Sequence, residues 1–276
     1  MRRLPNKLDF GKRTFVTLTS CACWHIGNPC SLVEKIRSHM LMLRRKGWPW
    51  IHLGDMIEAI TPIDKRFCGE THRDTIFKQL QGAAELVRLA RDTCIGLMIG
   101  NHEDKLCRVI GDPVRDICSR VWGEQDNPGS RWLGGLAMLR LQCPDGVCDV
   151  LATHSRLRFG GGTSDPDRDL VTAQIKLRRY LSGFEANLKL AAHTHRPLIA
   201  PPIERTVITA GENKRVKATS AWCAVTPSML ETYNAGDSEA YPAYSELEAY
   251  PHSPTGWIEA DIDRRGAVRD VRFVEA

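Results

Sequence analysis

The sequence contains no uninterrupted apolar run of the ~20 residues that a membrane-spanning helix needs, so no membrane partner is expected. The basic start, residues 1–13, has no apolar segment after it, and a secretory signal peptide is therefore not predicted. The ten cysteines do not form two matched C-x-x-C pairs, which excludes a cysteine-based zinc module. Without a secretory signal these thiols are expected to be reduced, and the cytoplasm is the predicted compartment.

The composition is that of an ordinary folded protein. Of 276 residues, 42% are hydrophobic and 26% are charged, which is enough for one large domain. No internal repeat or low-complexity linker interrupts the chain, so residues 1–276 are predicted to form a single domain. Within it, residues 226–256 are expected to be rich in loops and residues 257–273 to form a C-terminal hairpin. The net charge of +5 suits a polyanionic substrate, and the oligomeric state is left open.

Strand-like and helix-like segments alternate over most of the chain. Strands are predicted at residues 14–18, 50–53, 95–99, 148–153 and 188–192. Helices are predicted between them, at about residues 31–47, 75–92 and 165–181. This alternation predicts an α/β fold, in which ligands collect beyond the carboxyl ends of the strands.

Local signals set the expected limits of these elements. Ser31 begins a capping-box pattern and Gly47 should end the same helix. The apolar face of the second helix is expected to include Phe77. A Pro-Asp-Gly turn at residues 144–146 predicts a β-hairpin, and residues 207–225 are expected to form an antiparallel β section.

Five of the strand-like runs lead into a polar side chain of a type that binds metals. Any one of them, such as the aspartate of Gly54-Asp55, has an ordinary turn as its simplest interpretation. Imidazole nitrogens, carboxylates and amide oxygens are ligands for divalent transition metals, and here they recur at five ends of one predicted sheet. The residues are His25, Asp55, Asn101 with His102, His154, and His193 with His195.

The order of these residues resembles that of the calcineurin-like metallophosphoesterases. The family pattern is Asp-x-His, Gly-Asp-x-x-Asp/Glu, Gly-Asn-His-Asp/Glu, a lone histidine and Gly-His-x-His. The matching blocks span about residues 14–225 and are Cys23-Trp24-His25, Gly54-Asp55-Met56-Ile57-Glu58, Gly100-Asn101-His102-Glu103, His154 and Ala192-His193-Thr194-His195. Two residues depart from the pattern, Ala192 in place of a glycine and Cys23 in place of an aspartate that binds metal.

The resemblance implies an α/β sandwich of two mixed sheets flanked by helices. The first sheet should carry the early motifs, and the β-rich C-terminal third should build the second. It also implies two divalent metal ions, with manganese, zinc and iron as the candidates. The first metal would be held by Cys23, His25, Asp55 and His195. The second would be held by Asp55, Asn101, His154 and His193, so that Asp55 bridges the two.

Cys23 leaves two interpretations open. A thiolate can bind metal, and it favours zinc or iron over manganese. Alternatively, Cys23 is a buried thiol and the first metal site is weakened.

By resemblance, the protein is an enzyme that hydrolyses phosphoesters with a hydroxide activated by two metals. His102 would be the catalytic proton donor, and Glu103 would either orient its ring or lie on a helix surface. The basic charge favours a phosphodiesterase, acting on a nucleotide or as a nuclease on nucleic acid, over a phosphatase acting on monoesters. The alternative is a non-catalytic interaction scaffold. Substrate-binding residues are not assigned, because Arg156 and Arg158 suit either a phosphate contact or a solvated loop.

Overall fold

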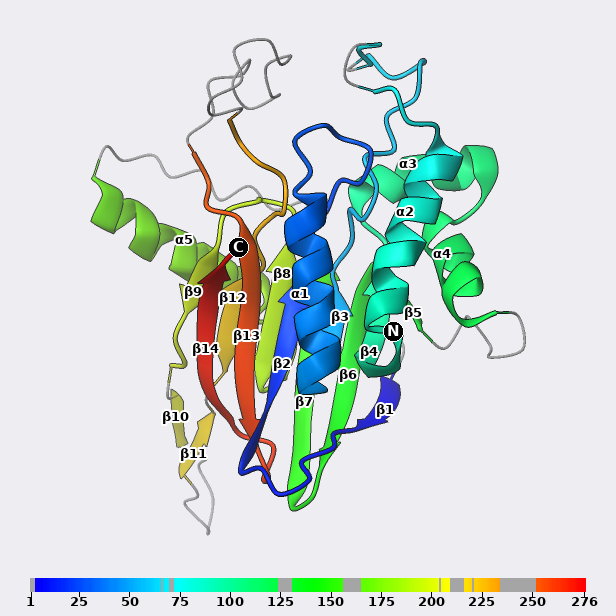
Figure 1. Cartoon of the computed structure of the whole chain (residues 1–276). Helices are drawn as coiled ribbons and strands as arrows, with labels where there is room; N and C mark the ends of the chain where they lie inside the picture. The colour runs from blue at the N-terminus through cyan, green and yellow to red at the C-terminus, as the bar shows by residue number, and fades with distance from the viewer. Residues whose placement is uncertain are drawn as a thin grey trace.

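The computed structural model describes residues 3–65, 67–69, 72–123, 131–155, 165–203, 205–208, 216–219, 221–233 and 252–276. Two six-stranded sheets lie face to face, and helices cover their outer sides (Figure 1). The helices are α1 (Val33–Lys46), α2 (Ile76–Leu89), α3 (Asn101–Ile110), α4 (Pro113–Trp122) and α5 (Pro166–Tyr180), with a short 3₁₀ turn at Arg91–Thr93. None of the helices in these ranges is long and apolar enough to span a membrane.

The first sheet has the strand order β14-β13-β2-β3-β4-β5. Its strands are β2 (Phe15–Cys21), β3 (Trp50–His52), β4 (Cys94–Met98), β5 (Trp132–Gly134), β13 (Gly256–Asp263) and β14 (Val268–Glu275). The strands from β2 to β5 run parallel, whereas β13 pairs antiparallel with both β2 and β14. The early motifs therefore lie at the ends of parallel neighbours, as predicted.

The second sheet has the order β1-β6-β7-β8-β12-β9. Its strands are β1 (Arg3–Lys7), β6 (Leu136–Cys143), β7 (Gly146–His154), β8 (Leu188–Ala192), β9 (Leu198–Ala200) and β12 (Trp222–Val225). The predicted hairpin of β6 and β7 is confirmed, and β7 and β8 run parallel, so both sheets are mixed. The predicted α/β sandwich is therefore present.

The C-terminal third is divided between the sheets, which corrects the expectation that it would build the second. The hairpin of β13 and β14 joins the first sheet, where Ile258 and Ala260 pair beside β2. The side chains of these two residues are buried in the core between the sheets, and this burial stabilises the pairing of β13 with the first sheet. Only β12 of the predicted antiparallel section enters the second sheet, and it runs parallel to β8. Strands β10 (Arg205–Ile208) and β11 (Val216–Thr219) form a separate two-stranded sheet.

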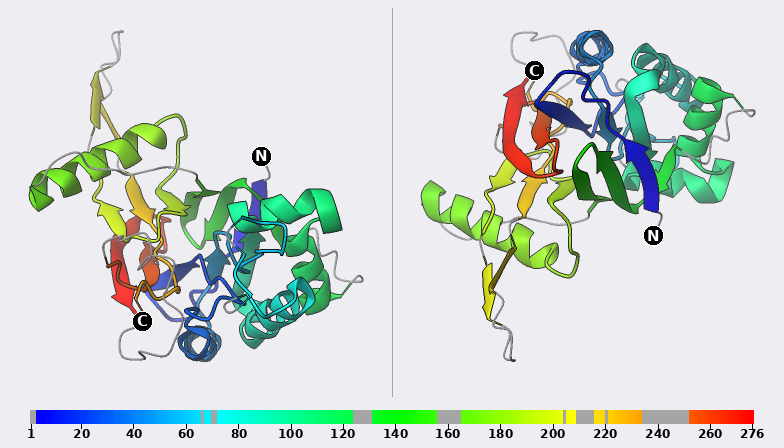
Figure 2. Two further views of the ribbon diagram at one scale, coloured as in Figure 1. Left: turned by 90° about the horizontal axis from the view of Figure 1, so that it is seen from above. Right: turned by 90° about the horizontal axis from the view of Figure 1, so that it is seen from below.

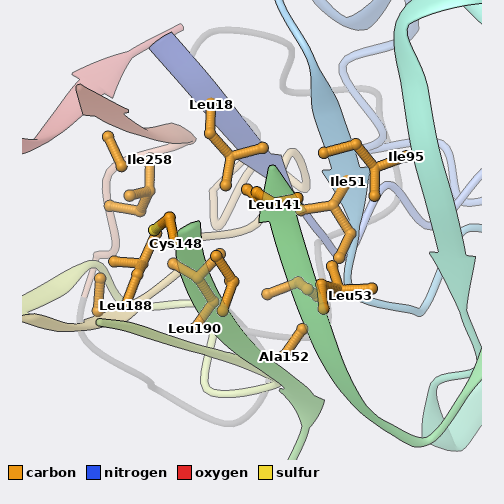
Figure 3. Close-up of a cluster of buried hydrophobic side chains, with 14 of the residues drawn as sticks. Leu18, Ile51, Leu53, Ile95, Leu141, Cys148, Ala152, Leu188, Leu190 and Ile258 are labelled. Atoms are coloured by element: carbon orange, nitrogen blue, oxygen red, sulfur yellow. The ribbon is translucent and has the colours of Figure 1, made fainter. Parts of the chain in front are cut away.

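The main core lies between the two sheets (Figure 3). Leu18, Ile51 and Ile258 from the first sheet face Leu141 and Leu190 from the second, and all are buried. A second apolar cluster packs α1, α2 and α4 on the outside of the first sheet, and a third packs α5 on the second. Viewed from above, α1 and α5 lie on opposite sides of the paired sheets (Figure 2).

Two local predictions about the helices are wrong. The Ser31 hydroxyl donates to the carbonyl of Trp24 at 2.6 Å, and α1 begins after Leu32 without a side-chain cap. Gly47 does end α1, in the left-handed conformation. On α2, Phe77 is 60% exposed and stacks under Arg120, because it lies on the same exposed helix face as Gln81 and Glu85, whereas Gln79 is buried and bonds to the backbone of Asp74.

Candidate metal centre

Two glycines bring the ends of β3 and β4 into contact around Asp55. Gly54 has φ 102° and Asp55 has φ 56°, both in the left-handed region. A Cβ on Gly54 would lie 2.6 Å from the Gly100 nitrogen, and a Cβ on Gly100 would overlap the Asp55 carboxylate. Only glycine fits at these two positions, because the backbones approach too closely for a side chain. The fully buried Asp55 carboxylate therefore lies against the turn that opens α3.

Glu103 holds this turn in place. Its carboxylate accepts backbone N–H groups from Asp55 at 3.0 Å, Met56 at 2.5 Å, Ile57 at 3.1 Å and Gly100 at 2.9 Å. Both expectations for Glu103 are thus corrected, since it is fully buried and its hydrogen bonds go to backbone and not to the His102 ring. Burial and the nearby Asp55 charge raise the pKa of Glu103 to about 7, against the lowering effect of the N–H donors.

His154, at the end of β7, points at Asp55 and Asn101. Its Nδ1 donates to the Leu53 carbonyl at 2.7 Å, so in the neutral ring Nε2 carries the lone pair. That Nε2 lies 3.1 Å from Asp55 Oδ2 and 3.0 Å from Asn101 Oδ1. Three acceptor atoms therefore converge on one point, an arrangement that only a proton or a metal cation satisfies. Burial lowers the pKa of His154, but the charge and hydrogen bond of Asp55, together with the Glu103 charge and the Leu53 carbonyl, outweigh burial and raise it.

A second group of ligand atoms comes from the ends of β2 and β8. His25 Nδ1 donates to Glu58 Oε2 at 2.8 Å, which leaves its Nε2 facing His195 Nε2 at 3.2 Å. A metal-binding histidine commonly donates its other nitrogen to a carboxylate in this way. The candidate ligand atoms of Cys23, His25 and His195 all lie within 4.8 Å of one another, as do those of Cys23, Asp55 and His154.

Cys23 is completely buried beneath these side chains. Burial, followed by the Asp55 charge, raises the pKa of the Cys23 thiol well above its ordinary value. A thiolate is therefore unfavourable at this position unless a cation neutralises it. Metal binding deprotonates a coordinating thiol outright, so the position of Cys23 fits either the ligand or the buried-thiol interpretation.

His193 lies beside His154, with ring centroids 5.4 Å apart. Its Nδ1 is buried without a hydrogen-bond partner in the described part of the chain, and the same holds for Asp55 Oδ2. Buried polar atoms are normally paired, so these two orphaned atoms fit the role of metal ligands. His193 does not belong to the clusters of three or more ligand atoms found among the described residues.

His102 follows Asn101 in the first turn of α3. Its backbone N–H donates to Asp55 Oδ1 at 2.9 Å, and its ring Nδ1 donates to the Glu58 carbonyl. Its ring lies edge-on to that of His25, with centroids 4.7 Å apart. Burial and the His25 charge lower the pKa of His102. With Nδ1 occupied, Nε2 is the ring atom left for a substrate.

Sequence reasoning missed the side-chain role of Glu58 and the position of His72. Glu58 was visible as the last residue of the Gly-Asp-x-x-Glu block, and its carboxylate pairs with His25. His72 comes from the loop before α2, with Nε2 3.9 Å from Glu58 Oε1, and no motif marks it. Arg156 and Arg158 lie outside the described residues.

Comparisons with known proteins add two structural likenesses. No protein-family model and no curated protein matches the sequence. The chain is similar to a predicted phosphoesterase from Streptococcus pneumoniae, with 10% identity and a TM-score of 0.33 over 95% of this chain and 98% of that one. It is also similar to a metallophosphoesterase from Sphaerobacter thermophilus, with 13% identity and a TM-score of 0.36 over 95% of this chain and 88% of that one. The argument for a metal centre rests on the geometry of this chain's own residues.

Proposed function

We propose that the chain, as a single domain over residues 1–276, is a metal-dependent phosphoester hydrolase. The observation that carries this proposal is the convergence of His154 Nε2, Asp55 Oδ2 and Asn101 Oδ1, three atoms that all act as acceptors when the His154 ring is neutral and that a cation can then share. Beside them the Nε2 atoms of His25 and His195 lie 3.2 Å apart, a contact that one proton or one cation can bridge. Two such groups at the ends of neighbouring strands are suited to divalent cations.

The ligands are proposed to divide into two sets that share Asp55. The first metal takes Cys23, His25, Asp55 and His195, and the second takes Asp55, Asn101, His154 and His193. Manganese, zinc or iron bound there would neutralise phosphate charge and lower the pKa of a bound water to near neutrality. Cys23 favours zinc or iron at the first position, because thiolates prefer softer ions.

The chain's own residues would orient and protonate the substrate. His102 is proposed to donate a proton from Nε2 to the departing oxygen, since the Glu58 carbonyl holds its Nδ1. Glu58 also fixes the His25 ring through Nδ1, so that His25 Nε2 faces the metal position. Glu58 is therefore proposed to orient both residues: its carboxylate holds the His25 ring, and its backbone carbonyl holds the His102 ring.

The proposed substrate is a phosphodiester, either a nucleotide or nucleic acid, and the proposed location is the cytoplasm. The net charge of +5 supports a polyanionic substrate. The test is a hydrolysis panel of bis-aryl phosphate, mono-aryl phosphate, and single- and double-stranded DNA, each with manganese, zinc or iron and with a chelator. Metal-dependent cleavage of the diesters is expected. An absence of turnover on every substrate with every metal would refute the proposed activity.

A non-catalytic scaffold is the second candidate, and Cys23 is the feature that favours it. If Cys23 is a ligand, Cys23→Ser should weaken binding of the first metal, and Cys23→Asp should shift preference toward manganese while activity is kept or raised. The scaffold predicts no turnover in the native protein, with activity gained only in Cys23→Asp. Equal metal binding by the native protein and Cys23→Ser would remove Cys23 from the ligand set.

A further inference from the structure

The ligands of the first metal come from both sheets. Cys23 and His25 follow β2 in the first sheet, whereas His195 follows β8 in the second. Their separation therefore depends on how the two sheets are tied together at this end. Cys23 and His195 have φ values of 50° and 60°, which side-chain-bearing residues rarely adopt and which persist only when surrounding contacts hold them.

Two serine hydroxyls hold these two backbone positions, together with the Met229 N–H, which donates to the Cys23 carbonyl at 3.0 Å. Ser228 Oγ donates to the Cys23 carbonyl at 2.9 Å, and Ser253 Oγ donates to the His195 carbonyl at 2.9 Å. Ser228 also reaches the other loop, because its backbone N–H donates to the His195 carbonyl at 3.4 Å. The Leu230 N–H donates to Ser228 Oγ at 2.8 Å, which directs the hydroxyl hydrogen toward Cys23.

The segment that carries Ser228 is itself anchored to both sheets. The hydroxyls of Thr226 and Ser20 lie 2.7 Å apart, which links the segment to β2. The Thr226 N–H donates to the Ala191 carbonyl at 2.8 Å, which links it to β8. Ser253 is fixed in turn by Thr232, whose hydroxyl contacts the Ser253 backbone at 3.2 and 3.3 Å. In the described residues between β12 and β13, both serines are thus attached to segments that are hydrogen-bonded to their surroundings, and the segment that carries Ser228 is bonded to both sheets.

We propose that Ser228 and Ser253 are positioning residues for the first metal, and this inference rests on the proposed function. They hold Cys23 and His195 at the separation that a shared ion requires. The second metal's ligands are held by other groups, since Glu103 accepts the Asp55 N–H and the Leu53 carbonyl accepts from His154. Loss of either serine should therefore affect the first metal and spare the second.

The test is metal titration of the metal-free protein and of Ser228→Ala and Ser253→Ala. Zinc binding is followed by calorimetry in two steps. Cobalt binding is followed by the thiolate-to-cobalt absorption that reports Cys23 alone. Each variant should bind the first ion about 10–100-fold more weakly, as expected when a group that orients a ligand is removed, with the second ion unaffected. Ser253→Thr keeps the hydroxyl and should bind like the native protein.

Ser182→Ala is the matched control, because the exposed Ser182 hydroxyl also donates to a backbone carbonyl, that of Arg179 at 2.7 Å, at the end of α5. Ser182→Ala should leave the affinities of the first and the second ion unchanged. Native-like first-ion affinity in both alanine variants would overturn the inference, and so would equal weakening of both ions. Ser253 is only part-buried, so its variant is expected to fold even if Ser228→Ala does not. If the native protein binds neither zinc nor cobalt, the proposed metal centre fails instead.

Discussion

Asp55 and Cys23 both follow strands of the first sheet, and the backbone around them is held in different ways. At Asp55, a single buried carboxylate, Glu103, accepts four N–H groups from both sides of the contact between β3 and β4. At Cys23, the carbonyl accepts from the Ser228 hydroxyl and the Met229 N–H, which lie about two hundred residues later in the chain, after β12.

The backbone around Asp55 is held by a nearby motif, whereas the backbone around Cys23 is held by the C-terminal part of the chain. We call these two parts of the centre the Asp55 half and the Cys23 half. Asp55, Asn101 and Glu103 belong to two short motifs whose own residues complete the structure around Asp55. Cys23 and His195 depend on residues from the C-terminal part of the chain. Substitutions at Asp55 and its neighbours should therefore affect folding and metals together, whereas substitutions around Cys23 should affect metals first.

The largest effect is expected for Asp55→Asn. Removing the shared carboxylate should abolish binding of both ions and reduce turnover by more than the ~10²–10⁴-fold that loss of a proton donor costs. Metal analysis and bis-aryl phosphate hydrolysis measure the two effects. A variant that keeps its metals and its activity would show that Asp55 is not the residue shared by the two sites.

His102→Ala should separate chemistry from metal binding within the same half. The metals should be retained if His102 serves chemistry alone, because its ring Nδ1 donates to the Glu58 carbonyl, although the ring also lies within reach of the ligand atoms of His25 and Glu58. The rate should fall by about 10²–10⁴-fold, mainly for esters with poor leaving groups. Comparing a good and a poor leaving group tests the role, and loss of metal content would contradict it.

Glu103→Gln should show how much the hydrogen bonds around Asp55 contribute to the free energy of unfolding. Its amide NH₂ cannot accept the N–H groups that one carboxylate oxygen now accepts, which leaves buried donors unpaired. The expected loss is about 1–3 kcal/mol in the free energy of unfolding, measured in denaturant with a chelator present. The exposed Glu85→Gln is the control and should change stability by less than about 0.5 kcal/mol. Equal stabilities of the two variants would refute this account of Glu103.

His39 lies on α1, away from both halves. A substitution there should change how the free energy of unfolding depends on pH without changing the metal centre. It is buried against Trp257, and burial lowers its pKa to about 3. Below about pH 6.5 the unfolded chain binds a proton that folded His39 does not, so stability falls as pH falls. His39→Gln should reduce that slope by up to about 1.4 kcal/mol per pH unit between pH 6 and 4. An unchanged slope in metal-free protein would contradict the assignment.

The strand ends were predictable because each one pairs an apolar run with a motif residue. His25, Asp55, Asn101, His154 and His195 are brought together as the resemblance implied. Strand β1 was missed because Arg3–Lys7 is polar and pairs only at the sheet edge with β6. The sheet chosen by β13 depends on pairing with β2 across more than two hundred residues of sequence, which no local pattern encodes.

Glu103, Ser228 and Ser253 illustrate why the supporting residues were harder to predict than the ligands. A ligand is recognised by its side-chain chemistry and its place after a strand. These three act by bonding to backbone groups, and such partners become visible only when the chain is folded. On α2 the burial of Gln79 was missed for a related reason, because its side chain bonds to the backbone of Asp74.

The most direct test of the central claim is the number of divalent ions that the native protein binds. Metal-free protein would be titrated with zinc, and separately with manganese, while hydrolysis of bis-aryl phosphate is followed in the same samples. The account predicts two ions per chain and activity that rises as the sites fill. A folded native protein that binds no divalent ion, or hydrolyses the ester equally well without one, would contradict it.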